Sequence, residues 1–113
     1  MKPPQKYDII LAKFQMCMMD EIAARRDAIH AVAKKHKAER LWVFGSCARK
    51  EERPDSDVDM LVKFGGGVGL VEYVRFEREL SRLLGRKVEL TVNSALLREP
   101  RFAERVCREA VAI

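Results

Sequence analysis

The fold of this chain is decided by two short segments, Gly45-Ser46-Cys47-Ala48-Arg49 and Ser56-Asp57-Val58-Asp59-Met60-Leu61-Val62. Asp57 and Asp59 are spaced i, i+2, and successive side chains of a strand point to opposite faces. The two carboxylates therefore point the same way, with Cα atoms about 6.5–7 Å apart, while Val58 points to the other face. Ionised carboxylates this close repel each other, and a divalent cation between them reverses that repulsion. The pattern predicts a strand with one packing face and one metal-binding face.

Hydrophobic periodicity and turn residues predict an alternation of helices and strands. Apolar residues recur at helical spacing over residues 7–37, a length that allows a break near Asp20. The expected strands are 41–44, 57–64 and 87–92, and the other expected helices are 46–52, 70–84 and 102–110. Gly85 is placed to end the helix 70–84 at its C′ position. We therefore expect an α/β fold, in which a small mixed sheet carries helices on one face and an added N-terminal helix.

The third expected strand supplies a further acidic residue, Glu89. Its apolar neighbours Val88 and Leu90 face the core, so Glu89 faces the other way and shares a face with Asp57 and Asp59. Three carboxylates can bind two Mg²⁺ ions about 3.5–4 Å apart, which stabilises both oxygens of an in-line displacement. The alternatives are a solvated strand face with turn-forming aspartates and, for Glu89, an ordinary exposed strand position.

The segment that begins at Gly45 has the composition of a phosphate-binding turn. Gly45 lets the backbone approach a phosphate with no Cβ in the way, and Ser46 adds a hydroxyl and an N–H at a helix start, where the dipole favours anions. Arg49 follows Ser46 by three residues, on the same helical face, within reach of a triphosphate. An ion pair of Arg49 with Glu52 or Asp55 is the alternative.

Length and charge limit the classes of protein that fit. The 113 residues suffice for one core, which we divide into an N-terminal helical extension (1–37) packed on a core domain (38–113). The formal net charge of +5 fits nucleic acid, an acidic protein partner or solvated helix faces, so nucleic acid is not excluded. No apolar run approaches the roughly 18 residues of a membrane helix, so no membrane partner is expected.

The cysteines and histidines are expected to be bystanders. The three cysteines are odd in number and share no metal-binding spacing, and the N-terminus lacks the layout of a signal peptide, which favours a reduced, cytoplasmic location. The position of Cys47 at a helix start could lower its pKa, although a spectator role is favoured. His30 and His36 are expected on the surface of the first helix.

The run from Gly45 to Asp59 resembles the signature of minimal nucleotidyltransferases of the polymerase-beta-like superfamily: Gly-Ser, a spacer, then Asp-x-Asp. The resemblance covers roughly residues 40–112. It is carried also by Ala48-Arg49, Arg53-Pro54, Ser56-Asp57 and the later Gly85-Arg86-Lys87-Val88-Glu89-Leu90. The chain departs from the family at two positions. Lys50 stands where members usually carry glycine, which adds charge at the rim of the loop, and Glu89 stands where the third carboxylate is usually aspartate.

The resemblance implies a function as well as a fold. It implies transfer of AMP from ATP to a hydroxyl, with Asp57, Asp59 and Glu89 as metal-binding and catalytic carboxylates and two Mg²⁺ ions as cofactors. Gly45, Ser46 and Arg49 would bind the nucleotide.

By the same resemblance the acceptor would be a tyrosine of a HEPN-type toxin. The chain would then be its antitoxin, in a hetero-oligomer. Three alternatives remain: an antitoxin that neutralises by binding alone, a stand-alone transferase acting on a small molecule, and a nucleic-acid-binding protein.

Overall fold

The computed structural model describes residues 17–96 and 98–113. Its elements are α2 (Met18–Ala24), α3 (Arg26–Lys35), β1 (Ala38–Phe44), α4 (Gly45–Ala48), β2 (Val58–Phe64), α5 (Leu70–Leu84), β3 (Val88–Val92), α6 (Asn93–Leu96), α7 (Pro100–Glu109) and β4 (Val111–Ala112). The part of the expected first helix before residue 17 lies outside the described residues. No helix in the described part of the chain is both long and apolar enough to cross a membrane.

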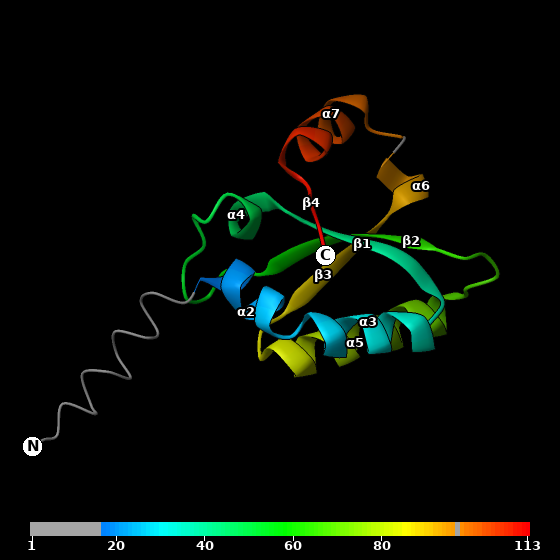
Figure 1. Ribbon diagram of the computed structural model, residues 1–113. Helices are drawn as coiled ribbons and strands as arrows, with labels where there is room; N and C mark the ends of the chain where they lie inside the picture. The colour runs from blue at the N-terminus through cyan, green and yellow to red at the C-terminus, as the bar shows by residue number, and fades with distance from the viewer. Residues whose placement is uncertain (1–16, 97) are drawn as a thin grey trace, which may run out of the picture.

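The strands form one mixed sheet in the order β3-β2-β1-β4 (Figure 1). β2 pairs with β1 antiparallel and with β3 parallel, and the short β4 adds an antiparallel edge to β1. In this register Asp59 lies opposite Phe44 on β1 and opposite Glu89 on β3. The expected mixed α/β fold is therefore confirmed, with β4 as an additional strand.

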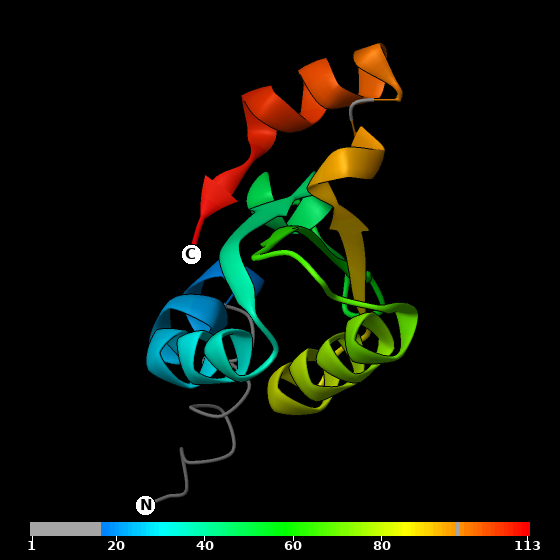
Figure 2. The same cartoon turned by 90° about the vertical axis from the view of Figure 1, so that its right-hand side faces the viewer.

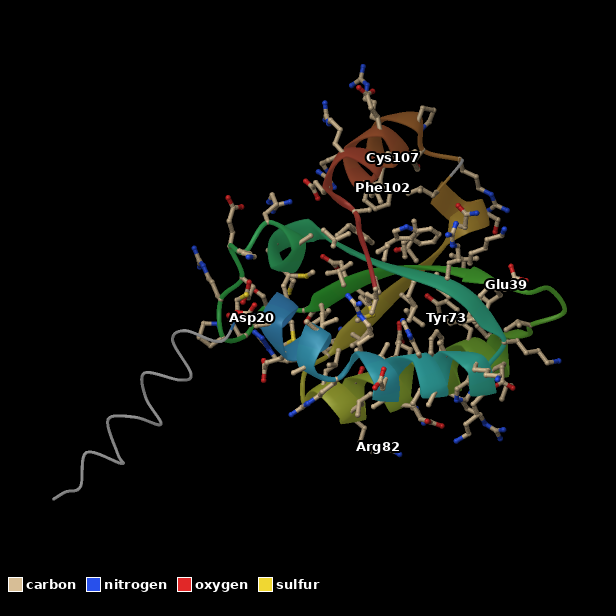
Figure 3. All side chains as sticks on the ribbon, viewed as in Figure 1. Asp20, Glu39, Tyr73, Arg82, Phe102 and Cys107 are labelled. Carbon is tan, nitrogen blue, oxygen red and sulfur yellow. The ribbon has the colours of Figure 1, made fainter. Side chains whose placement is uncertain are left out.

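Helices lie on both sides of this sheet (Figure 2), and not on one face as expected from the sequence. The larger core lies between the sheet and α2, α3 and α5, and it contains the inward residues Val58, Met60 and Val62 of β2. On the opposite face, α6 and α7 form a smaller cluster, built on Phe44, Leu61, Leu96 and Val106. Phe102 lies on the side of α7 that faces the sheet (Figure 3). The face of the sheet that carries the carboxylates is thus covered by α6 and α7, and it is open to solvent only beyond the end of this second cluster.

The largest differences from the expected elements lie in the first helix, in the helix expected over 46–52, which ends at Ala48, and in α6, which was not expected. The expected break near Asp20 is wrong in position, because α2 ends at Ala24 and α3 begins at Arg26, with Arg25 between them. Gly85 ends α5 in the left-handed conformation (φ +67°), as expected.

Three side chains of α5, spaced four residues apart, bind the outer edge of β3. The Ser81 hydroxyl accepts the Val88 N–H at 2.9 Å, and the Glu77 carboxylate accepts the Leu90 N–H at 3.0 Å. The Tyr73 hydroxyl donates to the Leu90 carbonyl. Because residues four apart lie on one face of a helix, α5 fixes the position of β3 along the sheet as well as packing against it.

His36 corrects the expectation that both histidines lie on the surface. Its side chain is buried, 4% exposed, between α3 and α5. One ring nitrogen contacts the Glu72 carboxylate, the other lies 3.0 Å from Glu79 Oε1, and the ring packs 5.5 Å from the Phe76 ring. His30 is exposed, as expected. The periodicity of α3 did not reveal this burial, because the partners of His36 come from a helix 36 to 43 residues later.

We predict that His36→Ala lowers the free energy of unfolding by about 1–3 kcal/mol, because it empties a buried site and removes the partner of two carboxylates. Urea unfolding followed by circular dichroism measures this change. His30→Ala, on the same helix, is the matched control and should have little effect. Equal losses in the two variants would contradict a special role for His36.

Candidate active site

A pocket of about 390 Å³ opens on the carboxylate-bearing face, between α4, the ends of the strands and α7. It is lined by Phe44, Gly45, Ser46, Arg49, Asp59, Glu89, Thr91, Phe102, Arg105 and Glu109. All of the residues predicted from the sequence to bind nucleotide or to catalyse line this pocket, except Asp57. The fold therefore brings together two segments more than 40 residues apart, the Gly45 turn and Glu89 of β3.

Asp59 and Glu89 meet because of the parallel pairing of β2 with β3. They occupy the same register position, and both point away from the large core. Asp59 is half-buried, and its pKa is raised, first by this burial and then by the negative charges of Glu89 and Asp57. The positive charge of Arg49 opposes this rise only in part. The three carboxylates are thus close enough to act on one another electrostatically.

Asp57 is not part of the lining of the pocket and directly precedes β2. Its carboxylate is 39% exposed, and the ammonium of Lys87 approaches it at 3.9 Å. The Cys47 thiol donates to the Asp57 backbone carbonyl at 3.7 Å, which ties α4 to the start of β2. This contact places the Gly-Ser turn and the first aspartate side by side.

Cys47 is a packing residue and not a reactive thiol. It is fully buried, and burial, with the nearby charge of Glu52, raises its pKa to about 11. The possibility of a lowered pKa for Cys47 is therefore wrong, since desolvation of the thiolate outweighs any effect of the short helix.

Gly45 makes a close approach to Asp59 that a side chain would oppose. Its φ is +74°, and a Cβ built on it would lie 2.6 Å from Asp59 Oδ2. Its backbone thus packs directly against the carboxylate face. Lys50 ends the same segment with φ +59°, a conformation that disfavours side chains and that glycine would adopt at lower cost.

Arg49 reaches into the pocket but binds acidic groups other than those expected. Its guanidinium donates to Glu51 Oε1 and to Glu109 Oε1, each at 2.8 Å. Arg49 thus forms ion pairs, as the alternative to phosphate binding required, but its partners are Glu51 and Glu109 and not Glu52 or Asp55. Glu109 also accepts the Gly45 N–H at 3.1 Å through its other oxygen.

A second pocket, of about 430 Å³, lies between α3, β1 and the C-terminal strand. Its ionisable lining consists of His30, Lys34, Glu39 and Arg40. One carboxylate among three basic side chains offers neither a paired acidic site nor a phosphate-binding turn. The first pocket is therefore the candidate active site.

Comparison with known proteins decides the family, because the profile of the nucleotidyltransferase domain matches residues 25–113. The chain belongs to the nucleotidyltransferase family. Protein adenylyltransferase MntA of Thermococcus cleftensis is 36% identical to it over 103 residues, which cover 87% of this chain and 98% of that protein.

Solved structures agree with this assignment. A structure described as a candidate minimal nucleotidyltransferase superposes with a TM-score of 0.74 at 39% identity, covering 88% of this chain and 98% of that one. A tri-AMPylated HEPN toxin of Shewanella oneidensis in complex with its MNT antitoxin shares the fold, with a TM-score of 0.56 at 16% identity and coverage of 80% and 69%.

Five pocket residues of this nucleotidyltransferase were not anticipated: Phe44, Thr91, Phe102, Arg105 and Glu109. Three of them come from α7, which was expected only as a closing helix. One signal was available in the sequence. Glu109 ends its helix, where the negative end of the helix dipole disfavours a carboxylate. An acidic residue at such a position needs a compensating donor elsewhere in the fold.

The acidic residues of this nucleotidyltransferase have the donor chemistry for Mg²⁺. Within residues 17–96 and 98–113, no three acidic, histidine or cysteine side chains converge closely enough to hold a metal ion as they stand. Asp57, Asp59 and Glu89 nevertheless form an all-oxygen set, which suits Mg²⁺, and burial together with their mutual repulsion raises the pKa of Asp59. A cation among them would remove that repulsion. The residues therefore fit the metal after a rearrangement of side chains.

We predict that Asp59→Asn raises the midpoint of thermal unfolding of the nucleotide-free protein at neutral pH. A carboxyl whose pKa is raised by folding binds more protons in the native state than in the unfolded state. Its ionisation therefore destabilises the fold as the pH rises from 3.8, the ordinary pKa of the group, through the raised pKa. The advantage of the variant should disappear as pH falls below that range.

Asp55→Asn, in the exposed turn before β2, is the matched control and should leave the midpoint unchanged. Calorimetry at several pH values makes the comparison. An Asp59→Asn protein no more stable than wild type at neutral pH would contradict the raised pKa of Asp59.

We also predict that Gly45→Ala is more destabilising than Gly85→Ala. Both glycines have positive φ, at a cost of about 1–2 kcal/mol for a side chain. Only the Cβ at position 45 meets an atom, Asp59 Oδ2, whereas nothing lies within 4 Å at position 85. Urea unfolding measures both losses, and equal losses would contradict the close approach.

Proposed function

We propose that this nucleotidyltransferase is a protein adenylyltransferase, which transfers AMP from ATP to a hydroxyl group with Mg²⁺ as cofactor. The observation that carries the proposal is the shared register position of Asp59 and Glu89, in a pocket that also contains the Gly45 turn and Arg49. Carboxylates for metal and donors for phosphate are then in one place. The name of the Thermococcus cleftensis relative supports transfer to a protein.

The roles follow from position. Asp57 and Asp59 would hold Mg²⁺, which when bound neutralises charge on the phosphate oxygens. The Gly45 N–H and the Arg49 guanidinium would bind and orient the triphosphate. Ser46, which lines the same pocket, would add its hydroxyl.

Glu89 is placed to act on the acceptor. As the acceptor hydroxyl attacks the α-phosphorus, the bond from that phosphorus to the oxygen bridging to the β-phosphate breaks, and pyrophosphate leaves. The hydroxyl proton passes to the Glu89 carboxylate, which acts as the general base. Glu89 is exposed at the surface of the pocket, where an incoming hydroxyl can reach it.

We infer that the acceptor is a tyrosine of a HEPN-type toxin and that modification neutralises the toxin. The shared fold with an MNT antitoxin bound to an AMPylated HEPN toxin supports this. The pocket opens at the surface beside α7, and the elements described for residues 17–96 and 98–113 leave it open to an incoming chain. A protein partner would supply the missing walls.

The decisive experiment is mass spectrometry of a HEPN-type toxin co-expressed with wild type, Glu89→Gln or Asp57→Asn. Glu89→Gln should lower transfer by about 10²–10⁴-fold while Mg-ATP binding largely persists, because Asp57 and Asp59 still hold a metal ion. Asp57→Asn should lose both binding and transfer, and chelation of Mg²⁺ should have the same effect on wild type. Glu89→Asp, which restores the family's usual residue, is the conservative control and should retain transfer.

AMP adducts with wild type and Glu89→Asp, with toxicity returning in the other variants, would support the proposal. Neutralisation by every variant without an adduct would overturn it, and would mean that binding alone is the function. Calorimetry of Mg-ATP binding distinguishes a variant that has lost the nucleotide site from one that has lost only the general base Glu89.

A further inference from the structure

The donors assigned to the phosphate already hold an anion, which is a side chain of the same protein. The Glu109 carboxylate accepts the Gly45 N–H at 3.1 Å through one oxygen and the Arg49 guanidinium at 2.8 Å through the other. Its side chain is only 15% exposed. These contacts join α7 to the Gly45 turn, across 60 to 64 residues of sequence.

A carboxylate and a phosphate are recognised by the same chemistry. Both offer only acceptor oxygens, and both bind guanidinium and backbone N–H groups through charge-assisted hydrogen bonds. The two carboxylate oxygens of Glu109 therefore occupy the positions that we assign to two oxygens of a bound phosphate. Its negative charge also contributes to the raised pKa of Asp59, which places Glu109 beside the acidic group as well.

Stability alone does not account for the position of Glu109. It is the last residue of α7, where the helix dipole disfavours an acidic group, and it adds a negative charge to a pocket that already contains Asp59 and Glu89. Arg49 does not depend on it for neutralisation, since Glu51 binds the same guanidinium at 2.8 Å. A neutral residue at position 109 would avoid both the unfavourable interaction with the helix dipole and the repulsion from Asp59 and Glu89.

We propose that Glu109 is an internal competitor for the phosphate subsite formed by Gly45 and Arg49, so that nucleotide binding must displace its side chain. The inference rests on the proposed function. While Glu109 occupies the donors, only the fraction of molecules with a vacated subsite can bind a triphosphate, and the apparent affinity falls by that fraction. Nucleotide binding and release of the end of α7 are then one coupled event.

The test is calorimetric titration of wild type, Glu109→Gln and Glu104→Gln with Mg-ATP, and with inorganic tripolyphosphate alone. Glutamine keeps the shape of the side chain and removes its charge. Glu104→Gln makes the same charge change on the same helix, but its carboxylate is 73% exposed and pairs only with Arg108 among the described ion pairs. Circular dichroism verifies that each variant is folded.

We expect Glu109→Gln to bind Mg-ATP about tenfold more tightly than wild type, which corresponds to a subsite vacant in about one molecule in ten. Glu104→Gln should bind as wild type does. The affinities for tripolyphosphate should follow the same order, because Glu109 competes with the phosphate groups of the nucleotide and not with its adenine base.

Two other results have different meanings. Suppose that Glu109→Gln binds Mg-ATP no more tightly than Glu104→Gln, while Asp57→Asn does not bind Mg-ATP. The proposal that Glu109 competes with the phosphate is then overturned, and the proposed nucleotide site is supported. If no protein binds Mg-ATP, the proposed function fails, and tripolyphosphate then decides the inference. Tighter binding to Glu109→Gln than to Glu104→Gln supports it, and equal or absent binding overturns it.

Discussion

The parallel register between β2 and β3 is the constraint on which the site depends. It sets Asp59 opposite Glu89 on the face away from the large core. A shift of one residue would turn Glu89 into the core and expose the buried Val88 and Leu90, so the penalty for an incorrect register is large. The hydrogen bonds from α5 to the backbone of β3 favour the same register of β3. The geometry of the acidic site is thus fixed by packing on the other side of the sheet.

The site itself opposes the stability that the rest of the fold provides. Burial and two neighbouring carboxylates raise the pKa of Asp59, and Gly45 adopts a left-handed conformation against it. Under the proposed function, a bound cation and phosphate oxygens would offset this cost, because a positive ion turns repulsion among carboxylates into coordination. The destabilising features are concentrated around Asp59, while the core beneath it consists of apolar residues such as Met60 and Val62.

Local patterns predicted the parts of this fold that depend on local interactions. Alternation identified β2 and β3 and assigned Asp59 and Glu89 to one face, and Gly85 marked the end of α5. The failures involve contacts between distant segments. The burial of His36 depends on α5, the partners of Arg49 include Glu109 from the last helix, and β4 exists only because β1 offers it an edge. No window of neighbouring residues contains that information.

The bonds between α5 and β3 also limit how this protein can meet other chains. An edge strand normally presents free amide and carbonyl groups, which invite another strand to pair with it and, in the worst case, lead to aggregation. Here the outward amides of Val88 and Leu90 are already bound by Ser81 and Glu77. A partner therefore cannot extend the sheet at β3 unless α5 first withdraws, so recognition on this side must proceed through side chains on the helical surface.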